Sequence, residues 1–396
     1  MAGLKTALEG IRVLDLGRYQ AGPRAALELA RLGAEVIKVE GLEGDESRKG
    51  MPQVRGQSGY WVHYNSGKKS IALDTRMKKG KEILQDLVKI SDVFIQNFRP
   101  GTIEKMGFSY DALRELNPKI VMLNVSAYGQ YGPYKDRVGF DTIGQAISGL
   151  MSITGYPENP PTRAGASIID RITALNGTIG ILAALREREF SGEGQAIDVC
   201  LADSGFSLTE IALANYLETG TVTERTGNFR KGAYNGAYKA ADGWVILVGS
   251  SQKVFERMCQ VIGKPEWVKD PRFTDRPARE THIEVIREAF ITWFLGQAMT
   301  EAVDILARAG VPCTEINDIA RASENPQIRE RELLVKVPDP YAGTIHVSGK
   351  YIKLSRSETV VGSPPAIGEH TEDILGGLLK YKPEHLQQLR EEGIIL

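Results

Sequence analysis

IRVLDLGRYQAGPRAALELARLGAEVIKVE, residues 11–40, is the stretch that decides the fold. Its two short apolar runs, residues 11–16 and 35–40, have the length of β-strands. Between them Pro23 can begin a helix that ends at Gly33. A strand, a helix and a second strand in this order predict two parallel strands joined by a right-handed crossover.

The same alternation continues along the chain and predicts an open α/β sheet. We expect helices over residues 81–90, 110–116, 172–188 and 201–217, and strands over residues 92–96, 120–126 and 196–199. The helix at 172–188 is apolar on several faces, so we expect it to be largely buried.

Composition changes after residue 218. Residues 219–236 are rich in Thr, Gly and charge, which is typical of a linker or loop. A β-hairpin around Ala241 and Gly243 and a run of helices follow, and they predict a smaller α+β domain. Strands return from residue 344, but periodicity leaves open whether this tail rejoins the first sheet.

The bulk composition is that of an ordinary globular protein. The 396 residues are 42% hydrophobic and 25% charged, and 49 Lys plus Arg against 50 Asp plus Glu leave a net charge of -1. Nucleic-acid binders usually carry a basic excess, so we expect no nucleic-acid partner. Neither a signal-peptide pattern nor a run of about 20 apolar residues is present, which predicts a cytoplasmic protein without a membrane partner.

Cysteine and histidine usage also limits the chemistry. Cys200, Cys259 and Cys313 are odd in number and far apart, which fits a reducing compartment and predicts no disulfide framework. The five histidines are scattered and match no metal-binding spacing, so we predict no metal site.

Motifs for common nucleotides are missing. The first strand–helix turn lacks G-x-G-x-x-G, and the P-loop signature is absent, so NAD and ATP are disfavoured. Residues 97–107, NFRPGTIEKMG, place Arg99 and Lys105 beside an expected helix start, which favours an anion site there. The alternative is an ordinary capped surface helix.

Two aspartates precede apolar helices. Asp170 lies in ASIIDRITALNG and Asp141 in GFDTIGQAISG. Each could simply cap its helix. Alternatively, a partly desolvated Asp170 beside helix amides could act as a nucleophile on an activated acyl carbon. The residues alone leave both interpretations open.

Several motifs taken in order resemble the class III coenzyme A-transferases, the family of formyl-CoA, carnitine and bile-acid CoA-transferases. They include IRVLDLGRYQAGP, NSGKKSIALDT, DVFIQNFRPGTIEKMG, ASIIDRITALNGTIGILAAL and PPAIGEHTEDIL, and they run nearly end to end. The resemblance implies that coenzyme A and acyl-CoA are substrates and that no cofactor is permanently bound. It also implies that Asp170 is the catalytic residue, which forms a mixed anhydride and then an aspartyl-CoA thioester, and that the acidic Asp141 lies near it.

The resemblance further implies a set of residues that hold coenzyme A. They are Gln20, Ala21, Leu73, Asp74, Thr75, Arg76, Asn97, Phe98, Arg99 and Lys105. The chain departs from formyl-CoA transferase at two coenzyme-binding positions, and residues 227–236 stand in place of the glycine-rich loop that shields that enzyme's intermediate. Gly41 stands where that enzyme has a stacking arginine, and Val138 replaces a lysine, with Arg137 beside it as a possible substitute contact. These departures argue against formyl-CoA and oxalate as substrates.

The family architecture implies an open Rossmann-like large domain built from both chain ends, a smaller α+β domain and an interlocked homodimer. We therefore expect residues 1–218 to begin the large CoA-binding domain and residues 219–233 to form a linker. Residues 234–329 would form the small domain, and residues 330–396 would form a linker and return to the large domain.

Two other functions fit the same scaffold. A 2-methylacyl-CoA racemase needs a base on each face of the α-carbon, and the resemblance places one of these bases at Phe140 here, which cannot exchange protons. A CoA-binding protein without transferase activity is the second alternative, which the presence of Asp170 disfavours.

Overall fold

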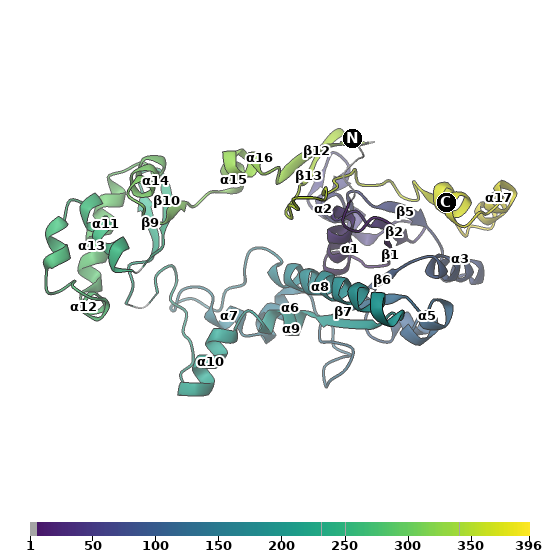
Figure 1. Cartoon of the computed structure of the whole chain (residues 1–396), viewed down its shortest axis with the longest axis horizontal. Helices are drawn as coiled ribbons and strands as arrows, with labels where there is room; N and C mark the ends of the chain where they lie inside the picture. Colours follow the sequence, from purple (N-terminus) through teal and green to yellow (C-terminus); the bar gives the residue numbers. More distant parts are fainter. Residues whose placement is uncertain (1–5, 231, 250, 340) are drawn as a thin grey trace. The chain divides into compact units, whose positions relative to one another are not determined.

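The computed structural model describes residues 6–230, 232–249, 251–339 and 341–396. Its residues group into two compact units (Figure 1). The first comprises residues 1–150, 163–213 and 327–396, and the second comprises residues 151–162 and 214–326. The domain boundaries expected at residues 219, 234 and 330 stay a prediction. They were inferred for an interlocked dimer, and the packing of a single chain does not test a dimer.

The first unit is built on a six-stranded sheet in which all neighbouring strands are parallel. Its strands are β1 (Arg12–Asp15), β2 (Glu35–Glu40), β5 (Lys69–Ala72), β6 (Val93–Gln96), β7 (Val121–Ser126) and β8 (Ala196–Cys200). With helices between them, these strands confirm the predicted α/β class. The strand order is β5-β2-β1-β6-β7-β8. The chain therefore adds β2 and β5 on one side of β1 and then β6, β7 and β8 on the other side, so the strand order reverses between β1 and β6.

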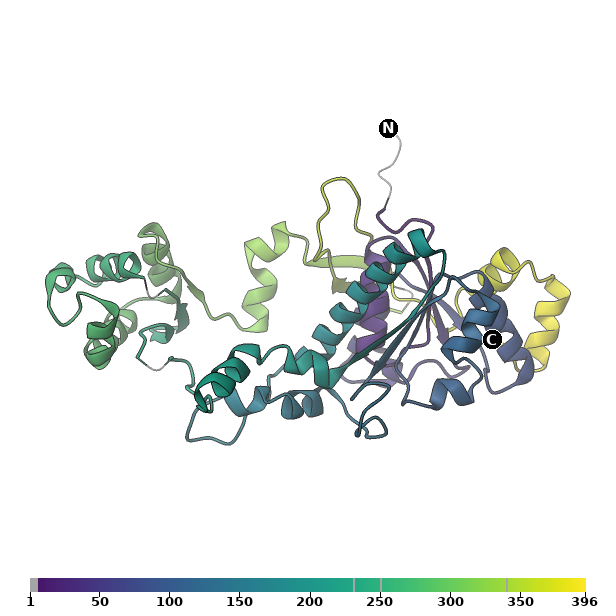
Figure 2. The same cartoon turned by 60° about the horizontal axis from the view of Figure 1, so that its bottom comes forward.

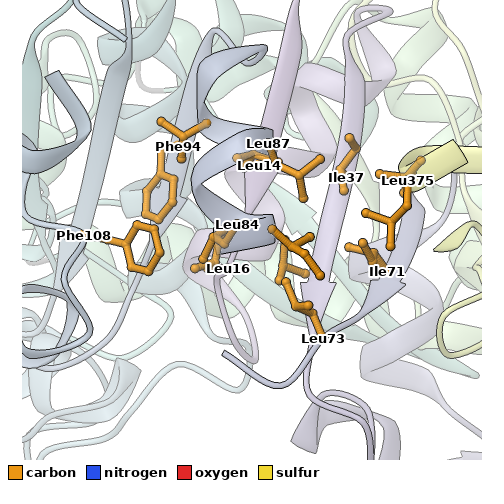
Figure 3. Packing of buried hydrophobic residues seen from close by; sticks show 14 of the residues in the cluster. Leu14, Leu16, Ile37, Ile71, Leu73, Leu84, Leu87, Phe94, Phe108 and Leu375 are labelled. Carbon is orange, nitrogen blue, oxygen red and sulfur yellow. The ribbon is translucent and has the colours of Figure 1, made fainter. Parts of the chain in front are cut away.

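Helices cover both faces of this sheet, as parallel sheets require. On one face lie α1 (Ala21–Arg31) and α8 (Ile168–Ser191) (Figure 2). They pack against alternate strand residues such as Val13 and Val36. The neighbouring residues Leu14 and Ile37 point to the other face. There they meet α3 (Lys78–Lys89) in a fully buried core (Figure 3).

Other elements of the first unit surround the sheet. They are η1 (Glu46–Lys49), α2 (Gly59–Asn65), α4 (Thr102–Lys105), α5 (Tyr110–Leu116), α6 (Asp141–Ile147), α9 (Leu201–Phe206), η3 (Asp373–Leu378) and α17 (Pro383–Glu391). Two antiparallel hairpins, β3 (Gln53–Val54) with β4 (Gln57–Ser58) and β12 (Leu334–Asp339) with β13 (Gly343–Ser348), complete it.

The C-terminal segment packs against the sheet formed by the N-terminal half. Ile395 pairs with Leu73, and the Asp74 amide donates to the Ile394 carbonyl at 2.9 Å. Side chains of η3 and α17 enter the same core, with Leu375 and Leu389 fully buried. The tail therefore belongs to the first unit, a point that periodicity left open.

The second unit contains a three-stranded antiparallel sheet in the order β11-β10-β9. The expected hairpin is confirmed, since β9 (Gly236–Ala240) pairs with β10 (Gly243–Leu247). The remaining members are β11 (Cys313–Glu315), η2 (Pro265–Lys269), α11 (Gln252–Val261), α12 (Arg276–Thr281), α13 (Ile283–Leu295), α14 (Met299–Arg308) and α15 (Ile319–Glu324). Within the linker predicted at 219–233, residue 231 lies outside the described residues. Three short helices, α7 (Leu150–Ile153), α10 (Glu210–Thr219) and α16 (Pro326–Glu330), span the boundaries between the units.

Two expectations about helices are wrong. The helix expected over 201–217 is two helices, α9 and α10, and the chain breaks where the Thr209 hydroxyl donates to the Ser148 carbonyl at 3.0 Å. Helix α8 is not largely buried within the chain, because Ile179 is 63% exposed and Phe190 75% exposed. Its length and composition would also suit a membrane span, but the core helix of a soluble protein passes the same test, and one face of α8 packs on the sheet.

Candidate active site

Asp170 lies in the first turn of α8 and is only partly exposed. The helix begins after Ser167, so Asp170 is not its cap. The pKa of Asp170 is raised to about 7, mainly because burial disfavours the charged carboxylate and also because Asp141 is near, while Arg171 opposes the shift. A carboxylate that is this poorly solvated is more reactive than one in water.

Asp141 holds the start of α8 in place. It is the first residue of α6, and its Oδ1 accepts from the amides of Ile169 at 2.7 Å and Asp170 at 3.1 Å. Its Oδ2 accepts from the Gln145 amide group at 2.5 Å. The carboxylate of Asp141 therefore satisfies amides of α8 that the helix itself leaves without partners. Its negative charge also faces the Asp170 side chain.

Gln20 links the first turn of the sheet to the same place. It precedes α1, and its Nε2 donates to the Ser167 hydroxyl at 3.2 Å. The Tyr64 hydroxyl donates to Gln20 Oε1 at 3.1 Å. Both ends of the Gln20 side chain are thus fixed, which positions it beside Asp170.

These side chains open into a pocket of about 770 Å³ at the carboxyl ends of the strands. Its walls come from the turns after β1, β6, β7 and β8, which contribute Gln20, Asn97, Ala127 and Leu201. Open α/β sheets bind ligands where the strand order reverses, and here that point lies between β1 and β6. Phe140, which is 74% exposed, forms another wall.

A second pocket of about 910 Å³ shares two residues with the first, Arg18 and Glu46. It follows β2, β5 and β6 and is lined by residues 39–46, 73–76, 102, 105 and 106 among others. Arg76 in its wall pairs with Asp74 at 2.8 Å, and Lys105 lies at the end of α4. Because α4 has only four residues, the charge there comes from side chains more than from a helix dipole.

A buried charge network supports the turn after β1. Lys68 donates to the Asp15 carboxylate at 2.7 Å, to the Pro23 carbonyl at 2.8 Å and to the Asn65 side chain at 2.9 Å. Lys38 is also fully buried and pairs with Asp45 at 3.1 Å. This network ties β1, α1 and α2 together beneath the pocket.

Besides the Asp170 site, the described residues include cysteines and possible metal ligands. Burial raises the pKa of Cys200 and of Cys259 to about 12, so both thiols stay protonated near neutral pH. Within the described ranges, no group of three or more His, Cys, Asp or Glu side chains could hold a metal ion.

Comparison with known proteins agrees with this geometry. Residues 8–371 match the profile described as CoA-transferase family III. The chain belongs to CoA-transferase family III. It is 36% identical to succinyl-CoA–D-citramalate CoA-transferase of Chloroflexus aurantiacus, over 98% of each chain. It is 34% identical to formyl-CoA:oxalate CoA-transferase of Streptomyces coelicolor, over 98% of this chain and 99% of that one.

A solved structure extends the family likeness to the fold. The crystal structure of a CaiB/BaiF family protein from Brucella suis superposes with a TM-score of 0.86 and 31% identity, covering 94% of this chain and 100% of that chain. As a member of CoA-transferase family III, the chain is an enzyme that transfers coenzyme A between an acyl-CoA and a carboxylate.

The two pockets bring together most residues that the family resemblance singled out. The first holds Gln20, Ala21, Asn97, Arg99, Asp141 and Asp170, and the second holds Leu73, Asp74, Thr75, Arg76, Phe98 and Lys105. Arg137 lines neither of these two pockets. Its guanidinium stacks on Tyr134 at 3.7 Å in an exposed loop.

Several residues of the first pocket were not predicted from the sequence. Arg18, Glu46, Tyr60 and Ser167 line the first pocket, although none of them was assigned a role from the sequence. For Arg18 the sequence held one signal, since this basic residue lies in the turn after the apolar run at 11–16, where α/β sheets bind ligands. Asn97 also bonds through its side chain to the backbone of Arg18, and its expected contact with coenzyme A stays a prediction.

Proposed function

We propose that this family III enzyme moves coenzyme A from an acyl-CoA thioester to a free carboxylic acid through covalent intermediates on Asp170. The observation that carries the proposal is the position of Asp170, a poorly solvated carboxylate that lines the pocket where the strand order reverses. A cavity that shares two residues with that pocket can take the rest of the coenzyme.

In the first half-reaction an Asp170 oxygen attacks the thioester carbonyl, the C–S bond breaks, and CoA leaves as a thiolate. A mixed anhydride now joins Asp170 to the donor acyl group. The thiolate attacks the Asp170 carbonyl, the C–O bond breaks, and the donor acid leaves with its new oxygen. Asp170 is then an aspartyl-CoA thioester.

In the second half-reaction the acceptor carboxylate attacks this thioester and releases the thiolate again. The resulting anhydride joins the acceptor to Asp170. Attack of the thiolate on the acceptor acyl carbon forms the new acyl-CoA and frees Asp170 as a carboxylate. One oxygen of the acceptor remains on Asp170, so an oxygen isotope in the acceptor should be transferred to this residue.

The residues around Asp170 have roles in these steps. Asp141 fixes the first turn of α8, and Gln20 is braced between Ser167 and Tyr64. We infer that Phe140 covers the acyl group and limits access of water, which would otherwise hydrolyse the anhydride.

The test incubates the purified enzyme with succinyl-CoA or formyl-CoA and a panel of acids that includes D-citramalate and oxalate. Mass spectrometry then identifies new thioesters. When both carboxylate oxygens of the acceptor are heavy oxygen, a single turnover should leave one labelled atom in the peptide that contains Asp170. Asp170→Ala should abolish transfer, whereas Asp111→Ala, which removes an exposed carboxylate from the first turn of α5, should retain it.

Transfer by the Asp170→Ala variant at the wild-type rate, or turnover without label in this peptide, would contradict the covalent mechanism. Exchange of the substrate α-proton into heavy water without transfer would instead favour a racemase.

We also propose that the enzyme acts in the cytoplasm as an interlocked homodimer. The apolar face of α8 that the chain leaves exposed, with Leu175, Ile179 and Phe190, supports a second copy as its cover.

A further inference from the structure

Arg18 and Glu46 lie where the two pockets meet. Each of them lines both pockets, and Arg18 Nη1 is 3.3 Å from Glu46 Oε1. The side chains remain 51% and 57% exposed, so the pair is open to solvent and to ligands. A long ligand that occupies both pockets has to pass this pair.

The backbone of Arg18 is fixed while its side chain reaches toward the junction. The Arg18 amide donates to Asn97 Oδ1 at 2.7 Å, and Asn97 Nδ2 donates back to the Arg18 carbonyl at 2.8 Å. The guanidinium stacks on the ring of Phe98 at 5.1 Å. Since the backbone bonds do not involve the side chain, a change of Arg18 to Ala should leave the turn after β1 intact.

Glu46 is held by the same turn. The Tyr19 hydroxyl donates to Glu46 Oε2 at 2.9 Å, and this bond is the main reason that the pKa of Tyr19 is raised. Tyr19 itself has a positive φ of 58°, a conformation that is uncommon for a residue with a side chain. The turn after β1 thus presents one cation and one hydroxyl to a single carboxylate.

The chemistry of coenzyme A suggests what this arrangement serves. Its thiol end and its adenosine end are joined by pantothenate and a diphosphate, and the diphosphate lies between the two ends. On the proposed function, the thioester lies at Asp170 in the first pocket and the adenosine in the second. The diphosphate then falls near the junction, and an arginine fork matches phosphate oxygens well.

We propose that Arg18 binds the diphosphate of coenzyme A, and that the Glu46 carboxylate occupies this arginine in the free enzyme and is displaced when the coenzyme binds. Exposed ion pairs contribute little to stability, so releasing Glu46 costs less than about a fivefold loss in affinity. A diphosphate carries more charge than one carboxylate and competes effectively for the guanidinium. The inference rests on the proposed placement of the two ends of the coenzyme.

The test compares three ligands by isothermal titration calorimetry at constant ionic strength. They are coenzyme A, dephospho-CoA, which lacks only the 3′-phosphate, and pantetheine, which lacks the diphosphate and adenosine. Arg18→Ala should weaken both coenzyme A and dephospho-CoA by about tenfold or more and leave pantetheine unchanged. Glu46→Gln should tighten the first two ligands by a few fold, and this gain should vanish in the double variant.

A matched control exists in the same unit. Arg114 and Glu193 form an ion pair at 2.9 Å with side chains 51% and 59% exposed, and neither lines the two pockets. Arg114→Ala and Glu193→Gln should leave all three affinities unchanged.

An equal loss for all three ligands in Arg18→Ala would overturn the proposal, and so would weaker coenzyme binding in Glu46→Gln. Because the Glu46→Gln effect is a gain, misfolding cannot imitate it. If the wild-type enzyme bound no coenzyme A at all, the proposed function itself would fail. If Arg18→Ala and Glu46→Gln both bound coenzyme A with the wild-type affinity, only this inference would be rejected.

Discussion

The Asp170 carboxyl group is partly protonated and partly ionised near neutral pH. Its raised pKa of about 7 means that a large part of the free enzyme carries the protonated form at neutral pH, which cannot attack a thioester. Burial makes the ionised form reactive and at the same time less populated.

The first prediction concerns pH. Transfer, measured as kcat/KM for the acyl donor, should fall as the pH decreases through about 7, because Asp170 becomes protonated. Asp141→Asn removes the like charge and should move this limb to lower pH without returning it to the ordinary carboxyl range, since burial remains. A limb that stays in place in the variant would show that the Asp141 charge has no influence on Asp170.

The second prediction concerns stability. Asp170 has an ordinary pKa of 3.8 when exposed and a pKa of about 7 in the fold, so the folded state binds more protons in between. Stability should therefore decrease as the pH rises from about 4 to about 7. Asp170→Asn removes this cost and should be more stable than wild type above pH 7, by at most about 4 kcal/mol. Denaturant unfolding at pH 8 and pH 4 measures the difference.

That gain should be nearly gone near pH 4, where the folded carboxyl group is neutral and the unfolded one is only about half ionised. A variant that is less stable than wild type at pH 8 would mean that the ionised carboxylate makes favourable contacts in the fold. The same variant should lose transfer, so stability and activity are opposed at this residue.

At the scale of elements, the site depends on close contact between α6, α8 and α9. A Cβ atom at Gly144 in α6 would lie 2.8 Å from a methyl carbon of Ile169 and 3.1 Å from Leu201. Only glycine lets α6 approach closely enough for Asp141 to reach the amides of α8.

The third prediction follows from this contact. Gly144→Ala should separate α6 from α8, lower the free energy of unfolding by about 1–3 kcal/mol and reduce transfer. Gly377→Ala is the control, because a Cβ there meets nothing within 4 Å. Denaturant unfolding and the transfer assay on both variants measure the effects, and equal behaviour of the two would refute the role given to the contact.

At this scale the sequence predicted five of the six strands of the first unit's parallel sheet and missed β5. Strands at residues 92–96 and 120–126 match β6 and β7 within a residue, since a continuous apolar run bounded by polar residues is a local signal. The break between α9 and α10 was not predictable, because the Thr209 hydroxyl bonds to Ser148, 61 residues away.

At the scale of the whole molecule, one face of α8 leaves apolar side chains exposed to water. An uncovered apolar surface on a long helix is costly in water, and it lies on the helix that carries Asp170. A second copy of the chain would cover it.

The fourth prediction is therefore a dimer that does not dissociate. Light scattering should give twice the chain mass of 43.5 kDa, and dilution into the nanomolar range should leave this mass unchanged, because interlocked rings separate only by unfolding. Ile179→Asp should impair assembly, whereas Glu187→Asp, also on α8, should not. A monomer at all concentrations would contradict the proposal.

By itself, the sequence determined the parallel α/β sheet, the family and the identity of Asp170 as the leading candidate. These follow from local apolar periodicity and from ordered motifs, which need no knowledge of distant contacts. Only the tertiary structure decided that Asp141 bonds to α8, that Asn97 clamps Arg18, and that Arg18 and Glu46 face each other between two pockets. Such partners are tens of residues apart in sequence, and only the packing of strand ends at one edge of the sheet brings them together.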